Sequence, residues 1–511
     1  MAIKICFLII FFAIMISIGL WTRRHAGNVE GFVLGGRNVG PWLSAFAYGT
    51  TYFSAVVFVG YAGQFGWKYG TAATWIGLGN AFIGSLLAWV LLGRRTRIMT
   101  QHLHSTTMPE FFGKRYNSNA LKIAASAIAF IFLIPYTASV YNGLSRLFEM
   151  AFDIPYTTCL IVMAAFTGLY VVLGGYMATA VNDFVQGLIM LGGISLVIVT
   201  VLNGQGGFMA AIQKLAQFES DVAITAGQPG AFTSFFGPDP LNLLGVVILT
   251  SLGTWGLPQM IHKFYAIKDE KAITTGTIIS TAFALVIAGG SYFLGSFGRL
   301  FDGPAIYRAD GAVAFDQIVP HMLSSLPDII IGVVVVLVLS ASMSTLASLV
   351  MTSSSTLTLD FLHGTLIKNM NEKQKVLWMR LLIVAFIVIS VLIALDPPIF
   401  IAQLMGISWG ALAGSFLAPF LYGLYSRRIT GAAVWACFAC GVGITVTNML
   451  FSYIASPINA GAIAMVAGLI IVPLVSLISP RPPQKRMDEV FACYETKVLV
   501  PRRTALNENG E

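Results

Sequence analysis

The sequence predicts an all-α integral membrane protein with about thirteen transmembrane helices. Of its 511 residues, 57% are hydrophobic and only 10% are charged, and the mean hydropathy is +0.80. A soluble domain of this length does not have that composition. Apolar stretches of roughly 20 residues, long enough to cross a bilayer, recur along the whole chain. The net charge of +8 lies in the connecting loops, so we expect no nucleic-acid partner.

The apolar stretches can be placed in order, because charged and turn-forming residues separate them. The first has Lys4 before it and Arg23 and Arg24 after it, with no small-residue cleavage site. It is therefore expected to be a retained span and not a signal peptide. The predicted spans are 3–22, 41–66, 72–97, 119–149, 155–174, 180–202, 239–263, 274–300, 325–358, 376–395, 398–424, 429–452 and 460–479.

Basic residues are concentrated on one side of the predicted membrane. Alternate loops and the C-terminal tail hold 24 of the 30 Lys and Arg residues, including Lys263 in the loop expected at 262–272. Because cytoplasmic loops are enriched in basic residues, the N-terminus is expected outside and the C-terminus in the cytoplasm of a multi-pass cell-membrane protein.

Two predicted spans contain helix-breaking residues near their middle. The segment 48–54 combines a glycine with three hydroxyl residues, and 253–258 combines two glycines with a proline. Each opens a block of five spans, and since five is odd, the second block must be inverted relative to the first. Paired breaks in inverted halves indicate the midplane binding site of a secondary transporter; ordinary kinks or close helix packing at glycine are the alternative. The predicted regions are an N-terminal extra helix with a cytoplasmic loop (1–40), the first five-helix repeat (41–202), an extracellular loop (203–238), the second five-helix repeat (239–424), two peripheral helices (425–479) and a cytoplasmic tail (480–511).

The span 325–358 carries a face of hydroxyl groups. Ala341, Ser344, Thr345, Ser348 and Thr352 recur at helical spacing and share one side of the helix. Hydroxyl and carbonyl oxygens suit an alkali cation that has lost its water, and the absence of acids on this face argues against a divalent ion. The alternative is that these hydroxyls bond to neighbouring helices or to their own carbonyls.

At these residues the chain resembles the sodium:solute symporter family, from about Glu30 to Pro419. Each motif is weak alone, but their order and spacing are specific. The matching residues are Glu30 to Arg37, Tyr136, Gly143 with Arg146 to Glu149, Gly174 and Gly175, Asn182 and Asp183 with Gln186 and Gly187, Pro258 with Lys263 and Phe264, Ala341 with Ser344 and Thr345, and Trp409, Gly410, Gly414 and Pro419. Tyr176 departs from the family pattern, where Leu, Met or Phe is usual.

The resemblance implies a leucine-transporter-like 5+5 inverted repeat with broken first and sixth core helices. It also implies a sodium ion between the first and eighth core helices. The implied ligands are the backbone carbonyls of Thr50, Phe53 and Ala341 and the hydroxyls of Ser344 and Thr345. Three of these five residues, Ala341, Ser344 and Thr345, lie on the hydroxyl face.

Asp183 is the one carboxylate that we expect inside a span and away from its margin. A carboxylate within a membrane is a candidate functional group; the alternative is an acid in the first turn of its helix, where the macrodipole favours it. The resemblance implies a role near the inner exit of the ion or in a second sodium site with Ser348. Because Ala347 replaces the other hydroxyl of that site, we expect one ion.

The implied solute site lies between the two breaks, and ordinary packing is the alternative for each residue. Its candidate residues are Ser54, Tyr136, Thr254, Trp255 and Pro258. The segment 256–259 resembles carriers of pantothenate, proline and monocarboxylates more than sugar carriers.

We therefore expect sodium-coupled uptake of a small organic solute, such as a monocarboxylate, by a protein that functions as a monomer in the lipid bilayer. The alternatives are a sugar or other solute, proton coupling, and a transporter-like membrane sensor, which the short tail disfavours. An enzyme is not expected, since the six histidines fall in loops or at helix ends.

Overall fold

The computed structural model describes residues 2–22, 28–367, 369–396 and 400–495. These residues form helices joined by turns, with a few isolated β-bridges. Three positions used in the orientation argument, Arg23, Arg24 and Lys368, lie outside the described residues, as does the tail from 496. The expected all-helical class is confirmed.

The first block of helices runs from residue 41 to 204. Between its regular helices, the segments 56–61, 80–87 and 89–93 have wider, π-type turns. Its helices are α3 (Pro41–Tyr52), α4 (Ala62–Tyr69), α5 (Thr74–Gly79), α6 (Arg94–His102), α8 (Asn119–Phe152) and α9 (Tyr156–Gly204).

The second block repeats this plan from residue 240 to 425. Its long helix α15 (Asp328–Thr356) continues as π-type turns to Leu366. Its helices are α11 (Pro240–Leu252), α12 (Pro258–Ala266), α13 (Glu270–Gly295), α15 (Asp328–Thr356), α16 (Glu372–Leu395) and α17 (Ile401–Tyr425).

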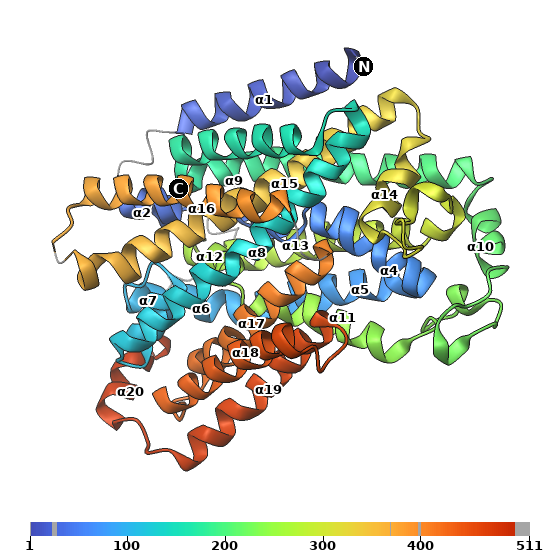
Figure 1. Cartoon of the computed structure of the whole chain (residues 1–511). Helices are drawn as coiled ribbons and strands as arrows, with labels where there is room; N and C mark the ends of the chain where they lie inside the picture. Colours follow the sequence, from blue (N-terminus) through green and yellow to red (C-terminus); the bar gives the residue numbers. More distant parts are fainter. Residues whose placement is uncertain (1, 23–27, 368, 397–399, 496–511) are drawn as a thin grey trace, which may run out of the picture.

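The remaining helices lie around this core or at its two ends. Helices α10 and α14 lie at one end of the molecule, and α7 and α20 lie at the opposite end (Figure 1). These helices are α1 (Ala2–Thr22), α2 (Val29–Leu34), α7 (Met108–Arg115), α10 (Phe208–Ala216), α14 (Phe315–Ser324), α18 (Gly431–Phe451), α19 (Pro457–Ile478) and α20 (Gln484–Phe491).

Eleven helical stretches among the described residues are long and apolar enough to cross a membrane, against about thirteen expected. Part of the difference arises at Gly70. The chain turns tightly there without interrupting its helical turns, so the stretch Val56–His102 covers parts of two predicted spans, 41–66 and 72–97. Gly70 has a φ of +58°, and a Cβ there would lie 2.0 Å from the carbonyl oxygen of Phe232, so only glycine fits. The helix at 156–169 is apolar but shorter than the others.

Both predicted breaks are present. Helix α3 ends at Tyr52, and Phe53 is extended, with φ −93° and ψ 122°. In the second block Leu257 is extended in the same way, with φ −84° and ψ 121°, and α12 begins at Pro258. The two halves therefore interrupt their first helix with the same backbone geometry, as an inverted repeat requires.

Helices α15 and α17 form the centre of the bundle. In their most apolar segments 83% and 94% of the residues are buried, against 17% for α1 and 33% for α18. Helix α15 packs against α3, α8 and α9, while α1 and α19 lie along opposite edges of the bundle (Figure 1). The hydroxyl face of α15 is thereby held inside the protein and away from lipid.

The helix that carries Asp183 begins earlier than the sequence indicates. Helix α9 bends at Gly175, whose φ of +61° is accessible to glycine, and a continuous span runs from Gly175 to Gly204. Asp183 therefore lies about two turns into this span. The alternative that it is an acid of the first helical turn is wrong.

Candidate functional site

The end of α3 supplies free carbonyl groups to the hydroxyl face of α15. A helix leaves its last four carbonyls without helical donors. In α3 the carbonyl of Gly49 accepts from the amide of Phe53, and the carbonyls of Thr50, Thr51 and Tyr52 have no backbone donor among the described residues. The negative end of the helix dipole lies at the same place. The break therefore creates a local environment that favours a cation.

Thr345 lies at the centre of these carbonyls. Its hydroxyl oxygen is 3.4 Å from the carbonyl oxygen of Thr50, 3.0 Å from that of Thr51, 3.2 Å from that of Phe53 and 3.1 Å from that of Ala341. A hydroxyl has one proton and can donate fully to only one of them. The carbonyl of Ala341 also accepts the helical bond of α15, whereas those of Thr50, Thr51 and Phe53 share this one hydroxyl proton. Such a convergence of carbonyl oxygens is suited to a desolvated alkali cation.

Ser344 connects this cluster to Asp183. Its hydroxyl lies 2.8 Å from the hydroxyl of Thr50 and donates to Asp183 Oδ1 at 2.6 Å. Both side chains are fully buried, and Asp183 is 1% exposed. The structure thus brings the five predicted sodium ligands together, and it places a carboxylate beside them. Thr51, whose carbonyl also faces the cluster, was not predicted as a ligand.

Lys263 is the basic partner of Asp183. The expectation that it lies in a cytoplasmic loop is wrong: Lys263 lies in α12, and its side chain is 3% exposed. Its Nζ is 3.7 Å from Asp183 Oδ2 and donates to the hydroxyl of Ser348 at 3.0 Å. Its burial could not be predicted from the sequence, because the sequence does not show whether the side chain of a basic residue near the end of a span points outward or into the bundle.

Asp183 is also not the only buried carboxylate within a span. Asp360, which the sequence places in a loop, is 1% exposed in the π-type continuation of α15. Its Oδ2 accepts a hydrogen bond of 2.5 Å from the hydroxyl of Thr107, the N-cap residue of α7. Asp360 therefore ties α15 to the short helix α7.

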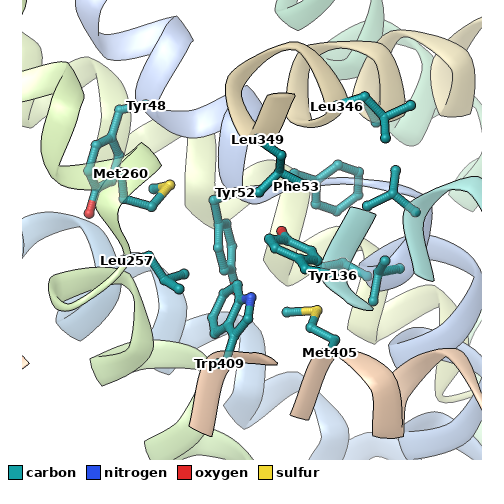
Figure 2. Close-up of a cluster of buried hydrophobic side chains, with 14 of the residues drawn as sticks. Tyr48, Tyr52, Phe53, Tyr136, Leu257, Met260, Leu346, Leu349, Met405 and Trp409 are labelled. Atoms are coloured by element: carbon teal, nitrogen blue, oxygen red, sulfur yellow. The ribbon is translucent and has the colours of Figure 1, made fainter. Parts of the chain in front are cut away.

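An aromatic cluster lies next to the oxygen cluster, between the two breaks. The rings of Tyr52 and Tyr136 lie 6.0 Å and 5.8 Å from that of Trp409. Figure 2 shows these three rings together, with Phe53 and Leu257 from the two breaks nearby. The three side chains are buried, and their Tyr52 hydroxyl, Tyr136 hydroxyl and Trp409 indole N–H have no hydrogen-bond partner among the described residues.

Unpaired donors inside a protein are costly, so a cluster of three is a candidate site for a solute that carries a hydrogen-bond acceptor. The Tyr136 hydroxyl interacts with the side chains of Ser54 and Trp409, but no bond of full hydrogen-bond geometry joins it to either. Ser54 also accepts a hydrogen bond from the amide of Val56 at 3.2 Å and so stabilises the first break. Of the residues in this cluster, Tyr52 and Trp409 were missed as candidates for the solute site; their aromatic side chains gave no signal distinct from packing.

The other predicted solute residues are engaged with a neighbouring segment. The Thr254 hydroxyl lies within hydrogen-bond distance of two carbonyls, that of Gly84 at 3.0 Å and that of Ser251 at 2.9 Å. The Trp255 indole N–H donates to the carbonyl of Ile83 at 2.9 Å. Both side chains therefore fasten the second break to the segment that follows α5. Pro258 begins α12 and lies at the edge of the break.

The described residues contain no group of three or more His, Cys, Asp or Glu side chains that could hold a metal. The site is instead made of neutral oxygens beside one carboxylate, with a separate aromatic cluster that has spare donors. Together with two inverted, interrupted five-helix blocks, this defines the class: a secondary transporter that binds a monovalent cation and a small solute.

The chain belongs to the sodium:solute symporter family, whose model matches residues 32–440. It is accordingly a multi-pass membrane transporter that couples sodium to the uptake of a solute.

Relatives and solved structures agree with this assignment. The chain is 28% identical over 93% of its length to the osmoregulated proline transporter OpuE of Bacillus subtilis, 94% of which is covered. It is 29% identical to the sodium/proline symporter of Staphylococcus aureus, over 86% of this chain and 84% of that protein.

Two solved structures share its fold. A sodium-coupled sialic acid symporter in a substrate-bound outward-open state has a TM-score of 0.73 at 16% identity, covering 94% of this chain and 99% of that one. A nucleobase-cation-symport-1 family transporter in a closed conformation has a TM-score of 0.54 at 12% identity, covering 91% and 98%. The expected leucine-transporter-like inverted repeat is confirmed.

Proposed function

We propose that the transported sodium ion binds among the carbonyls of Thr50, Phe53 and Ala341 and the hydroxyls of Ser344 and Thr345. The observation that carries this proposal is the single Thr345 hydroxyl surrounded by four carbonyl oxygens. Among the described residues, the carbonyl oxygens of Thr50 and Phe53 have only this one shared hydroxyl proton near them, and a cation would satisfy both. Because the ligands come from α3 and α15 of one chain, a monomer holds the complete site.

The solute is a small compound with one carboxylate, and proline is the first candidate. Two relatives are named as proline transporters. Support from the structure comes from the donors of Tyr52, Tyr136 and Trp409, which suit a carboxylate. The Trp409 and Tyr52 rings also offer apolar surface for a pyrrolidine ring. Pantothenate and short monocarboxylates share the carboxylate and are the other candidates.

Coupling follows from the position of the ion. A bound sodium joins the end of α3 to α15, and the adjacent Tyr52 and Phe53 are thereby fixed at the edge of the aromatic cluster. The solute then binds better to the sodium-bound protein, and this difference in affinity is the coupling free energy. One sodium crossing about 100 mV releases roughly 2.3 kcal/mol, and a tenfold gradient adds about 1.4 kcal/mol. This suffices to concentrate a neutral solute several hundredfold.

The proposed orientation has α10 and α14 outside and α7 and α20 in the cytoplasm. The end with α7 and α20 carries many of the basic residues, including Arg115, Arg427 and Arg486, which agrees with the positive-inside rule. Transport inward then runs from the end with α10 toward α7.

The decisive experiment is uptake of radiolabelled proline into proteoliposomes with and without a sodium gradient. We expect sodium-dependent accumulation, competition by unlabelled proline or by pantothenate and short monocarboxylates, and little competition by glucose or galactose. Sodium-dependent hexose uptake with no response to any carboxylate would contradict the proposed solute class. A pH gradient imposed in the absence of sodium serves as the control for proton coupling.

A further inference from the structure

Lys263 places a positive charge where a second cation would otherwise bind. The Asp183 carboxylate and the hydroxyls of Ser348 and Thr51 form a polar cluster beside the proposed sodium ligands. Ser348 and Thr51 lie 2.9 Å apart, and Lys263 Nζ lies 3.0 Å from Ser348 and 3.7 Å from Asp183. One carboxylate and two hydroxyls could bind an alkali cation, but the ammonium occupies their common side.

The lysine is held in this position on more than one side. Its Nζ lies 5.2 Å from the centre of the Tyr176 ring, within the range of a cation–π interaction. The tyrosine ring also contacts His262, the residue before Lys263. Tyr176 is the position at which the chain departs from its family pattern, and the buried lysine gives that aromatic ring a physical function.

The geometry points to Lys263 as a tethered cation that fills the second cation position, so that only one sodium ion binds per transport cycle. Two monovalent cations cannot share one carboxylate at this separation without strong repulsion in a buried site. Because the ammonium is covalently attached, it neutralises Asp183 throughout the cycle and is not released. Asp183 then orients Ser344 as a sodium ligand without itself binding a transported ion.

This inference rests on the proposed sodium site, and the two can be tested separately by counting bound sodium. Equilibrium dialysis with radioactive sodium is carried out on the purified full-length chain in detergent, with and without proline. We expect one sodium per protein for the wild type. In Lys263→Met, which keeps the length of the side chain but removes its charge, we expect two, with cooperative sodium dependence.

Two further variants identify the source of the second ion. Lys263→Met combined with Asp183→Asn removes the carboxylate as well, and its count should return to one. Lys263→Arg keeps a positive charge and should bind one. Lys4→Met is the matched control: Lys4 is also buried and paired, with Asp328 at 3.0 Å, but it lies on α1.

Each count gives a defined outcome. Two sodium ions bound to the wild type would overturn the tethered-cation inference while leaving the proposed sodium site intact, and this measurement needs no variant to fold. One sodium ion bound to a folded Lys263→Met protein would overturn it as well. No sodium bound to the wild type would instead contradict the sodium site itself.

Discussion

The hydroxyl of Ser344 donates a hydrogen bond of 2.6 Å to Asp183 Oδ1, which links the hydroxyl face of α15 to a buried carboxylate on α9. The same hydroxyl lies 2.8 Å from that of Thr50 on α3. Ser344 thus joins three helices from both halves of the molecule.

Removing both hydroxyls of the sodium cluster should weaken sodium binding. In Ser344→Ala combined with Thr345→Ala, we expect the sodium concentration for half-maximal uptake to rise at least tenfold, because each lost ligand costs about 1–3 kcal/mol. The measurement is initial uptake rate against sodium concentration in proteoliposomes. The matched control is Ser354→Ala with Ser355→Ala, whose hydroxyls bond only to carbonyls of their own helix. Unchanged sodium dependence in the first variant would refute the site.

Removing one member of the buried ion pair should lower the stability of the folded protein more than removing both members. Asp183→Asn leaves the Lys263 ammonium without its counter-charge, and a buried unpaired charge costs about 3–5 kcal/mol. We expect a marked loss of thermal stability in detergent and strongly slowed transport. Lys263→Met in the same protein should restore part of the stability, since the two side chains interact directly. Strictly additive losses in the double variant would show that the pair contributes no interaction.

The aromatic donors should control solute affinity and not sodium affinity. For Tyr136→Phe and Tyr52→Phe, we expect KM for the solute to rise roughly tenfold or more, because a hydrogen bond to a charged group contributes about 1.5–3 kcal/mol. The comparison variant is Thr254→Val, whose hydroxyl bonds to the Gly84 carbonyl. It should lower stability by about 1 kcal/mol and leave KM near its wild-type value. A large KM effect confined to Thr254→Val would move the solute site toward α11.

Asp316 should make stability depend on pH. Its Oδ2 accepts a hydrogen bond from the amide of Ile401 at 3.3 Å, but burial outweighs this and the attraction of Arg146 and Arg308, raising the pKa to about 6. The ordinary value is near 4, so the folded protein prefers the protonated carboxyl. The stabilisation of the folded protein by this carboxyl is complete below about pH 4 and is lost as the pH rises through 6. The free energy of unfolding falls by about 3 kcal/mol over that range.

The measurement for Asp316 is the difference in Tm between pH 5 and pH 8. We expect the wild type to be less stable at pH 8, and Asp316→Asn, which stays neutral, to lose this part of the pH dependence. The control is Asp310→Asn, an exposed acid in the segment just before α14. An equal pH dependence in the wild type and in Asp316→Asn would refute the prediction.

Much of this protein could be predicted from its sequence because the relevant signals are local. Hydropathy alone locates the spans, since a bilayer demands about 20 apolar residues for each crossing. Glycine and proline locate both breaks, and helical spacing places Ser344, Thr345 and Ser348 on one face. These features depend on the residues of a single segment, so no information about its neighbours is needed.

The tertiary structure alone decided which groups meet. Lys263 was counted as a loop charge and Asp183 as a possible first-turn acid, yet they form a buried pair from helices of different halves. Thr254 and Trp255 lie at a break, but their side chains donate to a neighbouring segment. The indole N–H of Trp409 is instead one of the three donors of the aromatic cluster that have no partner among the described residues. The sequence determines which residues can face the interior. Which of them contact one another depends on how helices far apart in the chain pack together, and that packing fixes the direction of each buried side chain.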